Sequence, residues 1–332
     1  MMKRTKTQEL NFTFGEPEAV HSEHLLDYLG VFPESGGEYY VPPISPSGLS
    51  KMPSANSHHG SCIKFRRNIA ANAYIRSPRG LSMADFERVV TDYLTFGYAY
   101  VEKQYNRLGK LAKLSHIPAL NMRKRTRGRG YRLLLPLGRW IDYDPDEVLE
   151  IAEYDTLQQI YGIPDWIGGL QSALLNQDAT LFRRRYYCNG AHLGYILYTN
   201  DAKFSEESRR LLREKFRQGR GVGNFKSAYF HIPNGNEKAF QLIPIGDISQ
   251  KDEFQNIKNI SSADVFVAHR VPLSLMSVQP QGGGVQSLGD PQKYAGVYFA
   301  TEGQAICRKF LALNPELPEN MRFNFKTKLE IE

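Results

Sequence analysis

The stretch YGIPDWIGGLQSALLNQDATLFRRRYYCNGAHLGYILY, residues 161–198, decides the fold. After the turn YGIP it predicts one long helix over residues 165–188, with Asp165 as the N-cap. Asn189-Gly190 favours a left-handed residue that ends this helix, and a strand over residues 193–198 follows directly. The helix has one face that carries mostly apolar residues at helical spacing: Ile167, Leu170, Leu174, Gln177 and Leu181.

Towards the C-terminus the pattern predicts more helices and a hairpin. Strands are expected at residues 225–232 and 238–245, joined by PNGNE, because Asn-Gly is the strongest short hairpin signal. A Gly/Gln-rich loop, QPQGGGVQSLGDP, occupies residues 279–291, and a short strand is expected within MRFNFKTKLEI. The expected helices cover residues 205–217, 249–269 and 292–312.

Towards the N-terminus, SMADFERVVTDYLTF predicts a helix over residues 82–96, capped by Ser82 and ended by Gly97. A strand over residues 98–105 and a turn at 106–109 predict an αβ module with an antiparallel hairpin. Residues 1–60 are interrupted by prolines throughout, so we expect an extended arm that wraps over another part of an assembly.

The segment NMRKRTRGRGYR, residues 121–132, holds six basic residues and no acid. Such a block repels itself and is best solvated or paired with phosphate. Two interpretations stay open: a solvated surface loop, or a loop that faces DNA or an acidic neighbour.

The composition predicts an ordinary globular protein, with 41% hydrophobic and 23% charged residues among 332. The net charge of +7 favours contact with an acidic partner such as nucleic acid or a membrane surface. Three cysteines without a CxxC pair, Cys62, Cys188 and Cys307, argue against a disulfide scaffold and a zinc site. We expect no secretory signal and no membrane span, since neither an apolar N-terminal region nor 18 consecutive apolar residues occur.

Enzyme motifs are missing from the sequence. It has no GxxxxGK[ST], GxGxxG, HExxH or GxSxG pattern. His58-His59 lies in the expected arm and is unsuited to a preorganised metal site, and the acidic run YDPDE, residues 143–147, is expected to be a solvated turn. We therefore expect no enzyme, no metal and no cofactor.

Residues 161–198 resemble the central signature of phage portal proteins of the P2-like (PBSX) family. Further segments are similar to the same family in the same order: residues 5–20, 101–123, 224–235, 251–276 and 287–299. The motifs YGxP, FRRxYYxNGA and HRxP carry the resemblance together. The positions that match them are Tyr161, Gly162, Pro164, Arg183, Arg184, Tyr186, Tyr187, Asn189, Gly190, Arg270 and Pro272.

The resemblance implies an α+β portal fold with a wing, a helical stem, a small β clip and a channel loop, and a ring of about twelve subunits. On that plan we expect the following parts: an N-terminal arm (1–60), the wing (61–204), stem helix 1 (205–220), the clip (221–246), stem helix 2 (247–276), the channel loop (277–291), and the last helix with a C-terminal segment (292–332).

The resemblance also implies a function, namely a ring at one capsid vertex that is the channel for DNA packaging and ejection. The expected partners are double-stranded DNA, passing non-specifically, the terminase large subunit, the major capsid and scaffold proteins, and the head-completion or tail connector proteins. We expect the protein in the virion, at the capsid vertex, and in the host cytoplasm during assembly. The alternative is a basic nucleic-acid-binding regulatory module.

Two residue sets are expected to serve these contacts. Neutral, flexible residues suit a channel loop that duplex DNA passes. The expected channel-loop set is Gln279, Gln281, Gly282, Gly283, Gly284 and Gln286. The alternative for this loop is an ordinary surface linker. The clip set would contact other subunits or the terminase: Phe225, Lys226, Tyr229, Asn234, Gly235 and Lys238. For Arg183, Arg184 and Arg185, pairing with acids or a partner subunit is favoured over contact with DNA.

Overall fold

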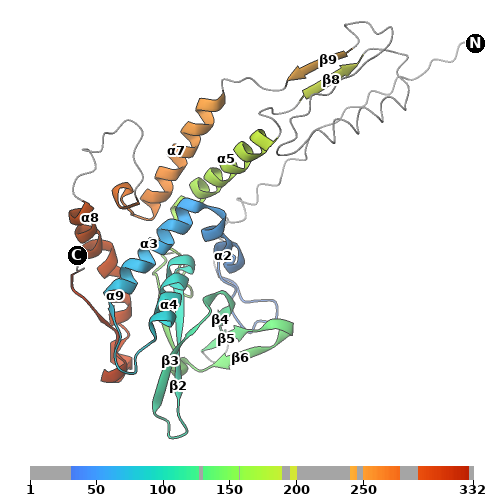
Figure 1. The fold of residues 1–332 in the computed structure, drawn as a ribbon. Coiled ribbons are helices and arrows are strands. Elements are labelled where there is room, and N and C mark those ends of the chain that lie inside the picture. Colours follow the sequence, from blue (N-terminus) through green and yellow to red (C-terminus); the bar gives the residue numbers. More distant parts are fainter. Residues whose placement is uncertain are drawn as a thin grey trace, which may run out of the picture.

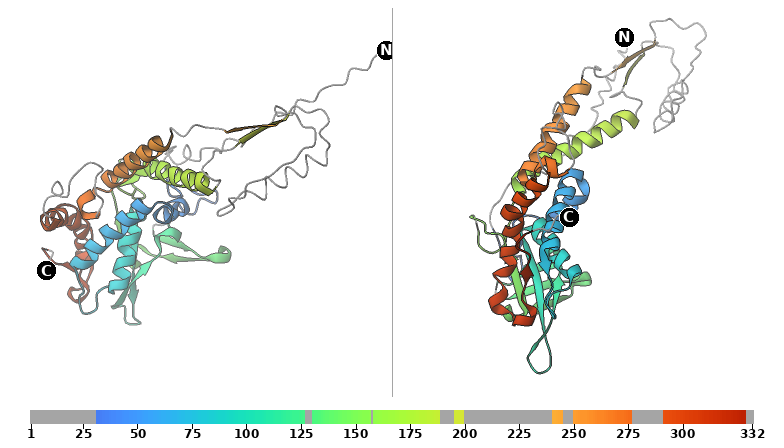
Figure 2. Two further views of the ribbon diagram at one scale, coloured as in Figure 1. Left: turned by 45° about the horizontal axis from the view of Figure 1, so that its top comes forward. Right: turned by 60° about the vertical axis from the view of Figure 1, so that its left-hand side comes forward.

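Two helices, α5 (Leu170–Cys188) and α7 (Gln250–Ala268), project together from a body of helices and small sheets (Figure 1). Both views of Figure 2 show the same arrangement. The computed structural model describes residues 31–126, 130–156, 158–188, 195–199, 240–244, 250–276 and 291–328. The predicted α+β class is confirmed, and no helix in these ranges is long and apolar enough to cross a membrane.

The body contains the described helices and strands that lie outside residues 170–268. Its helices are α2 (Pro46–Ala55), α3 (Ser57–Ala73), α4 (Met83–Phe96), α8 (Pro291–Tyr298) and α9 (Gln304–Leu311). Its strands are β1 (Tyr74–Ile75), β2 (Tyr98–Tyr105), β3 (Leu111–Ile117), β4 (Met122–Lys124), β5 (Tyr131–Leu134), β6 (Trp140–Tyr143), β7 (Val148–Ala152) and β10 (Asn324–Phe325).

Three antiparallel sheets organise the body, with strand orders β3–β2–β7, β4–β5–β6 and β1–β10. The β1–β10 pair brings the C-terminal segment back to the end of α3. Its aromatic residue Phe325 contacts Tyr74 and Phe86, whose rings stack 4.1 Å apart. The last strand therefore closes the main core, although it is shorter than the sequence predicts.

The helix α4 forms as predicted. The Ser82 hydroxyl accepts a hydrogen bond from the Asp85 amide, and Gly97 ends the helix with φ of 79°. Apolar residues at helical spacing on one face of α4 are buried, namely Phe86, Val89, Val90, Tyr93 and Leu94, and β2 and β3 form the predicted antiparallel hairpin. These signals are local, which is why the sequence alone suffices to find them.

The expected extended arm over residues 1–60 is wrong for its last part. Residues from Pro46 onward form α2 and α3, and their side chains Leu49 and Met52 are buried. Pro46 lies in the first turn of α2, where a missing N–H costs no helical hydrogen bond, and Ser45 and Asn56 supply the two N-caps. Residues 1–30 lie outside the described residues.

The basic segment 121–132 is neither a solvated loop nor a free basic surface in its described part. It forms most of the β4–β5 hairpin, and acids from three other segments pair with Lys124, Arg125 and Arg132. Lys124 Nζ lies 2.7 Å from Glu150, and Arg132 makes two hydrogen bonds to Asp142 and a further ion pair with Glu38. Pairing of this kind requires residues distant in sequence, so the block alone could not reveal it.

The segment between α5 and α7 carries one described two-stranded sheet. β8 (Tyr195–Thr199) pairs antiparallel with β9 (Phe240–Pro244). The strand predicted at 238–245 is therefore present, and its described partner is the strand predicted at 193–198. The other predicted strand, 225–232, and the helix at 205–217 lie outside the described residues. The helices predicted at 249–269 and 292–312 correspond to α7 and to α8–α9, which a π-helical turn at Phe299–Gly303 joins.

Candidate functional site at the base of the helix pair

The helices α5 and α7 lie antiparallel and in close contact at their base. Gly169, just before α5, approaches Ala268 at the end of α7 so closely that a Cβ at Gly169 would lie 2.4 Å from the Ala268 Cβ. One turn further, Ser172 Oγ donates to Asp264 Oδ2 at 3.0 Å. The small residue is what lets the two helix axes approach here.

A buried pair of asparagines joins both helices to the body. Asn176 Nδ2, on α5, donates to Lys258 O and Ser261 Oγ of α7, each at 3.0 Å. Asn56 Nδ2 donates to Ala173 O at 2.8 Å and to Asn176 Oδ1 at 3.3 Å. Because the Asn56 Oδ1 also caps α3, one hydrogen-bonded network fixes α3, α5 and α7. Satisfied buried networks of this kind specify one arrangement of the parts they connect.

Two buried histidines form a second connection between α3 and the end of α7. His59 Nδ1 and His269 Nε2 lie 2.8 Å apart, so one ring donates and the other accepts. Both rings pack against Trp166, whose Nε1 donates to Leu94 O at 2.7 Å. Burial lowers the pKa of His59 to about 4. Burial and the nearby charge of His59 and Arg66 lower the pKa of His269 to about 2, so both rings are neutral at pH 7.

An ion-pair cluster surrounds Asp165. Arg66 donates two hydrogen bonds to its carboxylate, at 2.9 and 2.7 Å, and Arg270 Nη1 donates a third at 2.8 Å. Burial alone would raise the pKa of Asp165, but the hydrogen bonds and charge of the two arginines hold it below its usual range. The predicted role of Asp165 as N-cap of the long helix is wrong. A 3-10 turn at Ile167–Gly169 precedes α5, and the carboxylate faces the arginines instead.

The exit from α7 is built on Arg270. Its φ is 56°, a left-handed conformation that favours glycine. The Arg270 and Val271 amides donate to Val267 O and Phe266 O, which closes the helix end. The Arg270 side chain then bridges Asp165 and Glu302, the latter at 3.3 Å. An arginine at this position therefore connects the end of α7 to both the body and the α8–α9 helix.

The YGIP turn holds the body together beside this cluster. The Tyr161 hydroxyl accepts from the Lys124 amide at 2.9 Å and donates to Tyr40 O at 2.7 Å. A Cβ at Gly162 would lie 2.1 Å from Gly97 O, so the two glycine backbones are in contact. Pro164 O accepts from the Ile167 amide at 3.1 Å and starts the turn into α5.

Comparison with known proteins identifies the group of proteins to which this arrangement belongs. The family described as "Phage portal protein" matches residues 79–287. The chain is 40% identical over 292 residues to the "Probable portal protein" of Escherichia phage P2, covering 88% of this chain and 83% of that protein.

The chain belongs to the phage portal protein family.

A second relative and several solved structures agree with the portal family. The "Probable portal protein" of Haemophilus phage HP1 is 37% identical over 310 residues, covering 91% of this chain and 89% of that protein. The neck of an empty gene transfer agent particle contains a chain with a TM-score of 0.58 at 15% identity, covering 85% and 84%. An HK97 family phage portal protein from Corynebacterium diphtheriae has a TM-score of 0.53 at 16% identity, covering 80% and 92%. These structures establish the portal fold, and nothing supports the alternative of a regulatory nucleic-acid-binding module.

The portal-motif residues predicted from sequence fall into three groups. Tyr161, Gly162 and Pro164 form the turn before α5, where Tyr161 and Gly162 contact β4 and the end of α4, and Arg270 and Pro272 form the exit from α7, where Arg270 contacts Asp165. Arg183 and Arg184 are exposed further along α5, and Tyr186 and Tyr187 lie in its last turn.

The third group, Asn189 and Gly190, lies outside the described residues. So do the whole clip set (Phe225, Lys226, Tyr229, Asn234, Gly235 and Lys238) and the whole channel-loop set (Gln279, Gln281, Gly282, Gly283, Gly284 and Gln286).

The buried residues that join the helix pair to the body were missed by the sequence reasoning: Asn56, His59, Asn176 and His269. The one available signal was the run Asn56-Ser57, which is a typical helix start.

Proposed function

We propose that copies of this chain close into a ring of about twelve subunits at one capsid vertex, around a channel for DNA packaging and ejection. The observation that carries the proposal is the pair of projecting helices, which expose large apolar side chains among their polar ones. On α7, Val267 is 75% exposed and Ile260 is 64% exposed, and on α5 Leu175 is also exposed. Ile260 and Val267 lie seven residues apart on one face of α7, and large apolar side chains so exposed indicate a surface that another subunit covers.

The helix pair is suited to be the wall of such a channel. Each helix has 19 residues, which corresponds to a length of about 28 Å. The Asn56–Asn176 network, the histidine pair and the Asp165 cluster fix this wall to the body at its base. A wall held rigidly in each subunit allows identical head-to-tail contacts to close on themselves.

The same contacts lead us to a revised plan of the parts. The sequence assigned stem helix 1 to residues 205–220, but the described partner of α7 is α5. We therefore take α5 and α7 as the stem, residues 189–249 with the β8–β9 pair as the clip, and residues 277–290 as the channel loop. The body, from residue 31 to the start of α5, is the wing, together with α8, α9 and the C-terminal segment.

The partners follow from this plan. In this proposal the clip set, with Phe225 and Asn234, docks the terminase large subunit, and that separate protein supplies the energy of packaging, so no enzymatic activity is assigned to the portal itself. The wing contacts the major capsid and scaffold proteins, and head-completion or tail connector proteins bind later. The neutral channel-loop residues, with Gln279 and Gly283, face duplex DNA without reading its sequence. The protein acts in the virion after assembly in the host cytoplasm.

Light scattering and electron microscopy of the purified chain test the ring. We expect closed rings from the wild type and a loss of rings from the double variant Ile260→Asp, Val267→Asp, because buried aspartates without partners oppose association. Leu108→Asp is the matched control, since Leu108 is an exposed leucine on the distant β2–β3 turn. A wild-type chain that stays monomeric at high concentration would contradict the proposal.

Deletion of residues 279–286 tests the channel loop separately. The expected result is that rings still form while packaging or retention of DNA fails. Normal packaging by this variant would show that the segment does not face DNA.

A further inference from the structure

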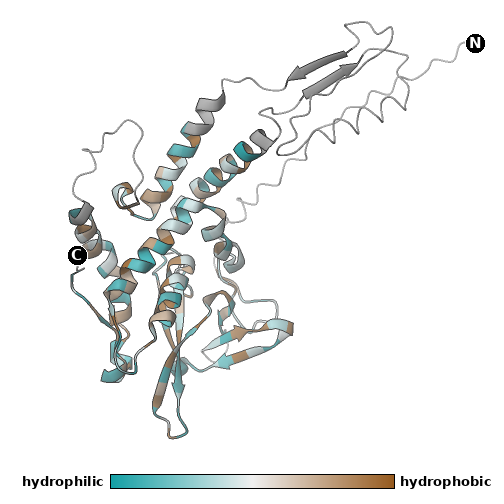
Figure 3. Ribbon diagram, in the orientation of Figure 1, coloured by the Kyte–Doolittle hydropathy of each residue, from teal (hydrophilic) through white to brown (hydrophobic). Residues whose placement is uncertain are grey.

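The β4–β5–β6 sheet has an open edge at β6. Among the described strands β6 pairs with β5 alone, and three of its four residues are exposed. Two of these are large apolar residues, Trp140 at 54% and Ile141 at 44% exposure. Figure 3 shows that this end of the sheet projects from the body and carries hydrophobic colour. An apolar strand edge left open in this way pairs readily with another strand.

The β5–β6 pairing fixes which backbone groups of β6 face the open edge. The Leu135 amide donates to Arg139 O. Because alternate residues of an antiparallel pair exchange hydrogen bonds, Arg139 and Ile141 bond toward β5. The amide and carbonyl groups of Trp140 and Asp142 therefore point to the open edge, where a further strand would bond to them.

The N-terminal segment, residues 1–30, joins the described chain beside the opposite edge of this sheet. Tyr39 bridges to Arg125, and the Tyr40 amide donates to Lys124 O, so this part of the chain lies next to β4. Strands lie about 4.8 Å apart, which places the far side of β6 about 25 Å from residue 31. Residues 15–30 can span up to about 50 Å. The segment that precedes them is therefore long enough to reach β6 of its own subunit.

The sequence LNFTF, residues 10–14, is suited to this edge. Apolar residues at Leu10, Phe12 and Phe14 alternate with polar ones. Such alternation, with aromatic residues, favours a strand with one buried face. Ile141 offers the matching face of β6, because its partner Leu133 packs against the main core. The aromatic residues of LNFTF would extend this apolar layer.

Charge favours one direction of pairing. Three cations precede LNFTF, namely Lys3, Arg4 and Lys6. Only Glu9 opposes them there, and Glu16 follows the strand segment. On β6 the order is reversed, since exposed Arg139 precedes the strand and exposed Asp144 and Asp146 follow it. An antiparallel partner therefore brings the three cations near the two acids and Glu16 near Arg139, whereas a parallel partner would bring like charges together.

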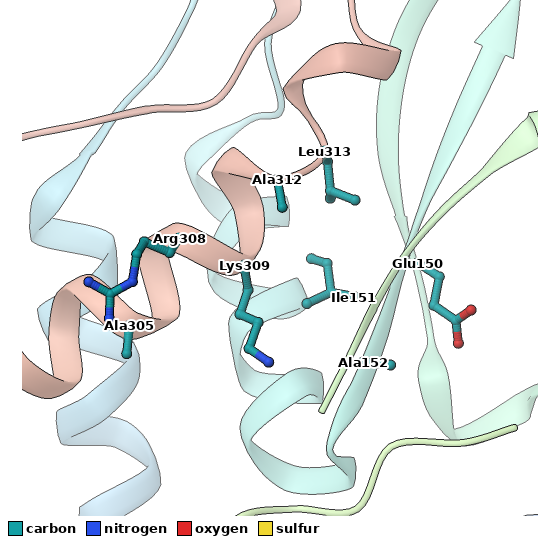
Figure 4. Close-up of a pocket in the computed structure, with 8 residues that line it drawn as sticks. All are labelled: Glu150, Ile151, Ala152, Ala305, Arg308, Lys309, Ala312 and Leu313. Carbon is teal, nitrogen blue, oxygen red and sulfur yellow. The ribbon is translucent and has the colours of Figure 1, made fainter. Parts of the chain in front are cut away.

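Other places on the body are poorer receptors for this segment. Figure 4 shows the groove between β7 and α9. Its charged residues Lys309 and Glu150 already form ion pairs within the subunit. Its apolar residues Ile151 and Leu313 are buried there. The edge strand β3 exposes Lys113, which repels a basic segment.

We propose that residues 10–14 add to the open edge of β6 in the same subunit as an antiparallel strand, with Phe14 opposite Ile141 and Phe12 opposite Tyr143. Thr13 then exchanges backbone hydrogen bonds with Asp142. Attachment to the same chain keeps this segment at a high effective concentration near β6, which favours it over a strand from another molecule. The pairing lies within one subunit, so it does not depend on the proposed ring.

Hydrogen exchange of the full-length chain measures whether the edge is occupied. The amides of Trp140 and Asp142 should exchange about tenfold or more slowly in the wild type than in a variant that lacks residues 2–16. Thr13→Pro removes the amide that would donate to Asp142 O and should behave like the deletion. Thr5→Pro is the matched control and should behave like the wild type. Equal exchange in the wild type and the deletion variant would overturn the proposal.

A disulfide tests the register and the subunit in which the strand lies. In a Cys188→Ser background, the pair Phe14→Cys, Ile141→Cys should oxidise to a bond within one chain, because opposite residues that share no hydrogen bonds have the closest side chains. Thr13→Cys, Ile141→Cys is the control. Thr13 lies on the other face of the strand, so this pair should react about tenfold more slowly.

The outcomes separate this pairing from the proposed ring. A disulfide that joins two chains, or equal reaction of the two cysteine pairs, would overturn the pairing within one subunit even if rings form. A wild type that forms no ring but shows the slow exchange and the disulfide within one chain would refute the proposed function and support this pairing.

Discussion

The rings of His59 and His269 are hydrogen-bonded to each other across 2.8 Å in the core, although the two residues lie on different helices. The remaining ring nitrogens, His59 Nε2 and His269 Nδ1, have no hydrogen-bond partner among the described residues. The groups that face the pair are Trp166, Arg66, Asp165 and Arg270. Burial disfavours a proton on either ring, and at His269 the charges of Arg66 and Arg270 lower the pKa further.

Stability should therefore fall as the pH falls below about 6.5. The unfolded chain takes up protons at the ordinary histidine pKa, whereas the folded chain resists until about pH 4 at His59 and about pH 2 at His269. The unfolded state thus binds more protons across this range, which lowers the free energy of unfolding by about 2 kcal/mol per histidine at pH 5. Urea unfolding at pH 7, 6 and 5 measures the slope. The double variant His59→Asn, His269→Gln keeps an uncharged hydrogen bond, so its free energy of unfolding should depend less on pH. If the wild type and the variant show the same dependence, the two histidines are not the cause of the loss of stability.

Asp165→Ala should be among the most destabilising single changes. Arg66 has a side chain that is 3% exposed, and removal of its partner leaves a buried charge uncompensated, which costs about 3–5 kcal/mol. Arg88→Ala removes the exposed Arg88–Asp85 pair and should cost no more than about 0.5 kcal/mol. Chemical denaturation of both variants measures their free energies of unfolding. An equal decrease in the two variants would show that the Asp165 cluster is not buried in solution.

Substitutions at Arg270 separate the effect of its backbone conformation on stability from the effect of its side chain. Arg270→Ala keeps the left-handed backbone strain and loses the half-exposed ion pairs to Asp165 and Glu302, which should lower stability by about 0.5–1 kcal/mol. Arg270→Gly loses the same pairs but relieves the strain, so it should be about 1 kcal/mol more stable than the alanine variant. Thermal unfolding of the three proteins tests this order. An alanine variant as stable as the glycine variant would contradict the left-handed conformation.

Gly162→Ala should be poorly tolerated. Its Cβ would lie 2.1 Å from Gly97 O, and because the obstacle is backbone, the YGIP turn would have to move away from the end of α4. We expect a loss of about 3 kcal/mol. Gly168→Ala is the control, since a Cβ there meets nothing within 4 Å, and it should be neutral or slightly stabilising. Similar stability for the two variants would place Gly162 away from Gly97.

The parts of the fold that sequence could predict are those with local signals. The caps and apolar stripe of α4, the β2–β3 turn and the extent of α7 all depend on residues within one or two turns of each other. The helices α2 and α3 were missed because Pro46 and Pro53 suggested an irregular arm, whereas Pro46 begins α2 and Pro53 lies in its last turn.

The candidate site depends mainly on distant partners. Asp165 meets Arg66 and Arg270 from segments on either side of it in the chain, and no local pattern distinguishes such an acid from an N-cap. The same holds for Asn56 and Asn176. The family motifs identified the correct region, since YGxP directly precedes Asp165 and HRxP contains Arg270, but they gave no information on which atoms form the contacts.

The antiparallel pairing of Tyr195–Thr199 with Phe240–Pro244 brings the two ends of residues 200–239 together. An insert whose entry and exit meet in this way can change in length or sequence without displacing the helices on either side. If this insert docks the packaging ATPase, as we propose, related phages can exchange it as a unit and adapt to a different ATPase while the rest of the subunit stays unaltered.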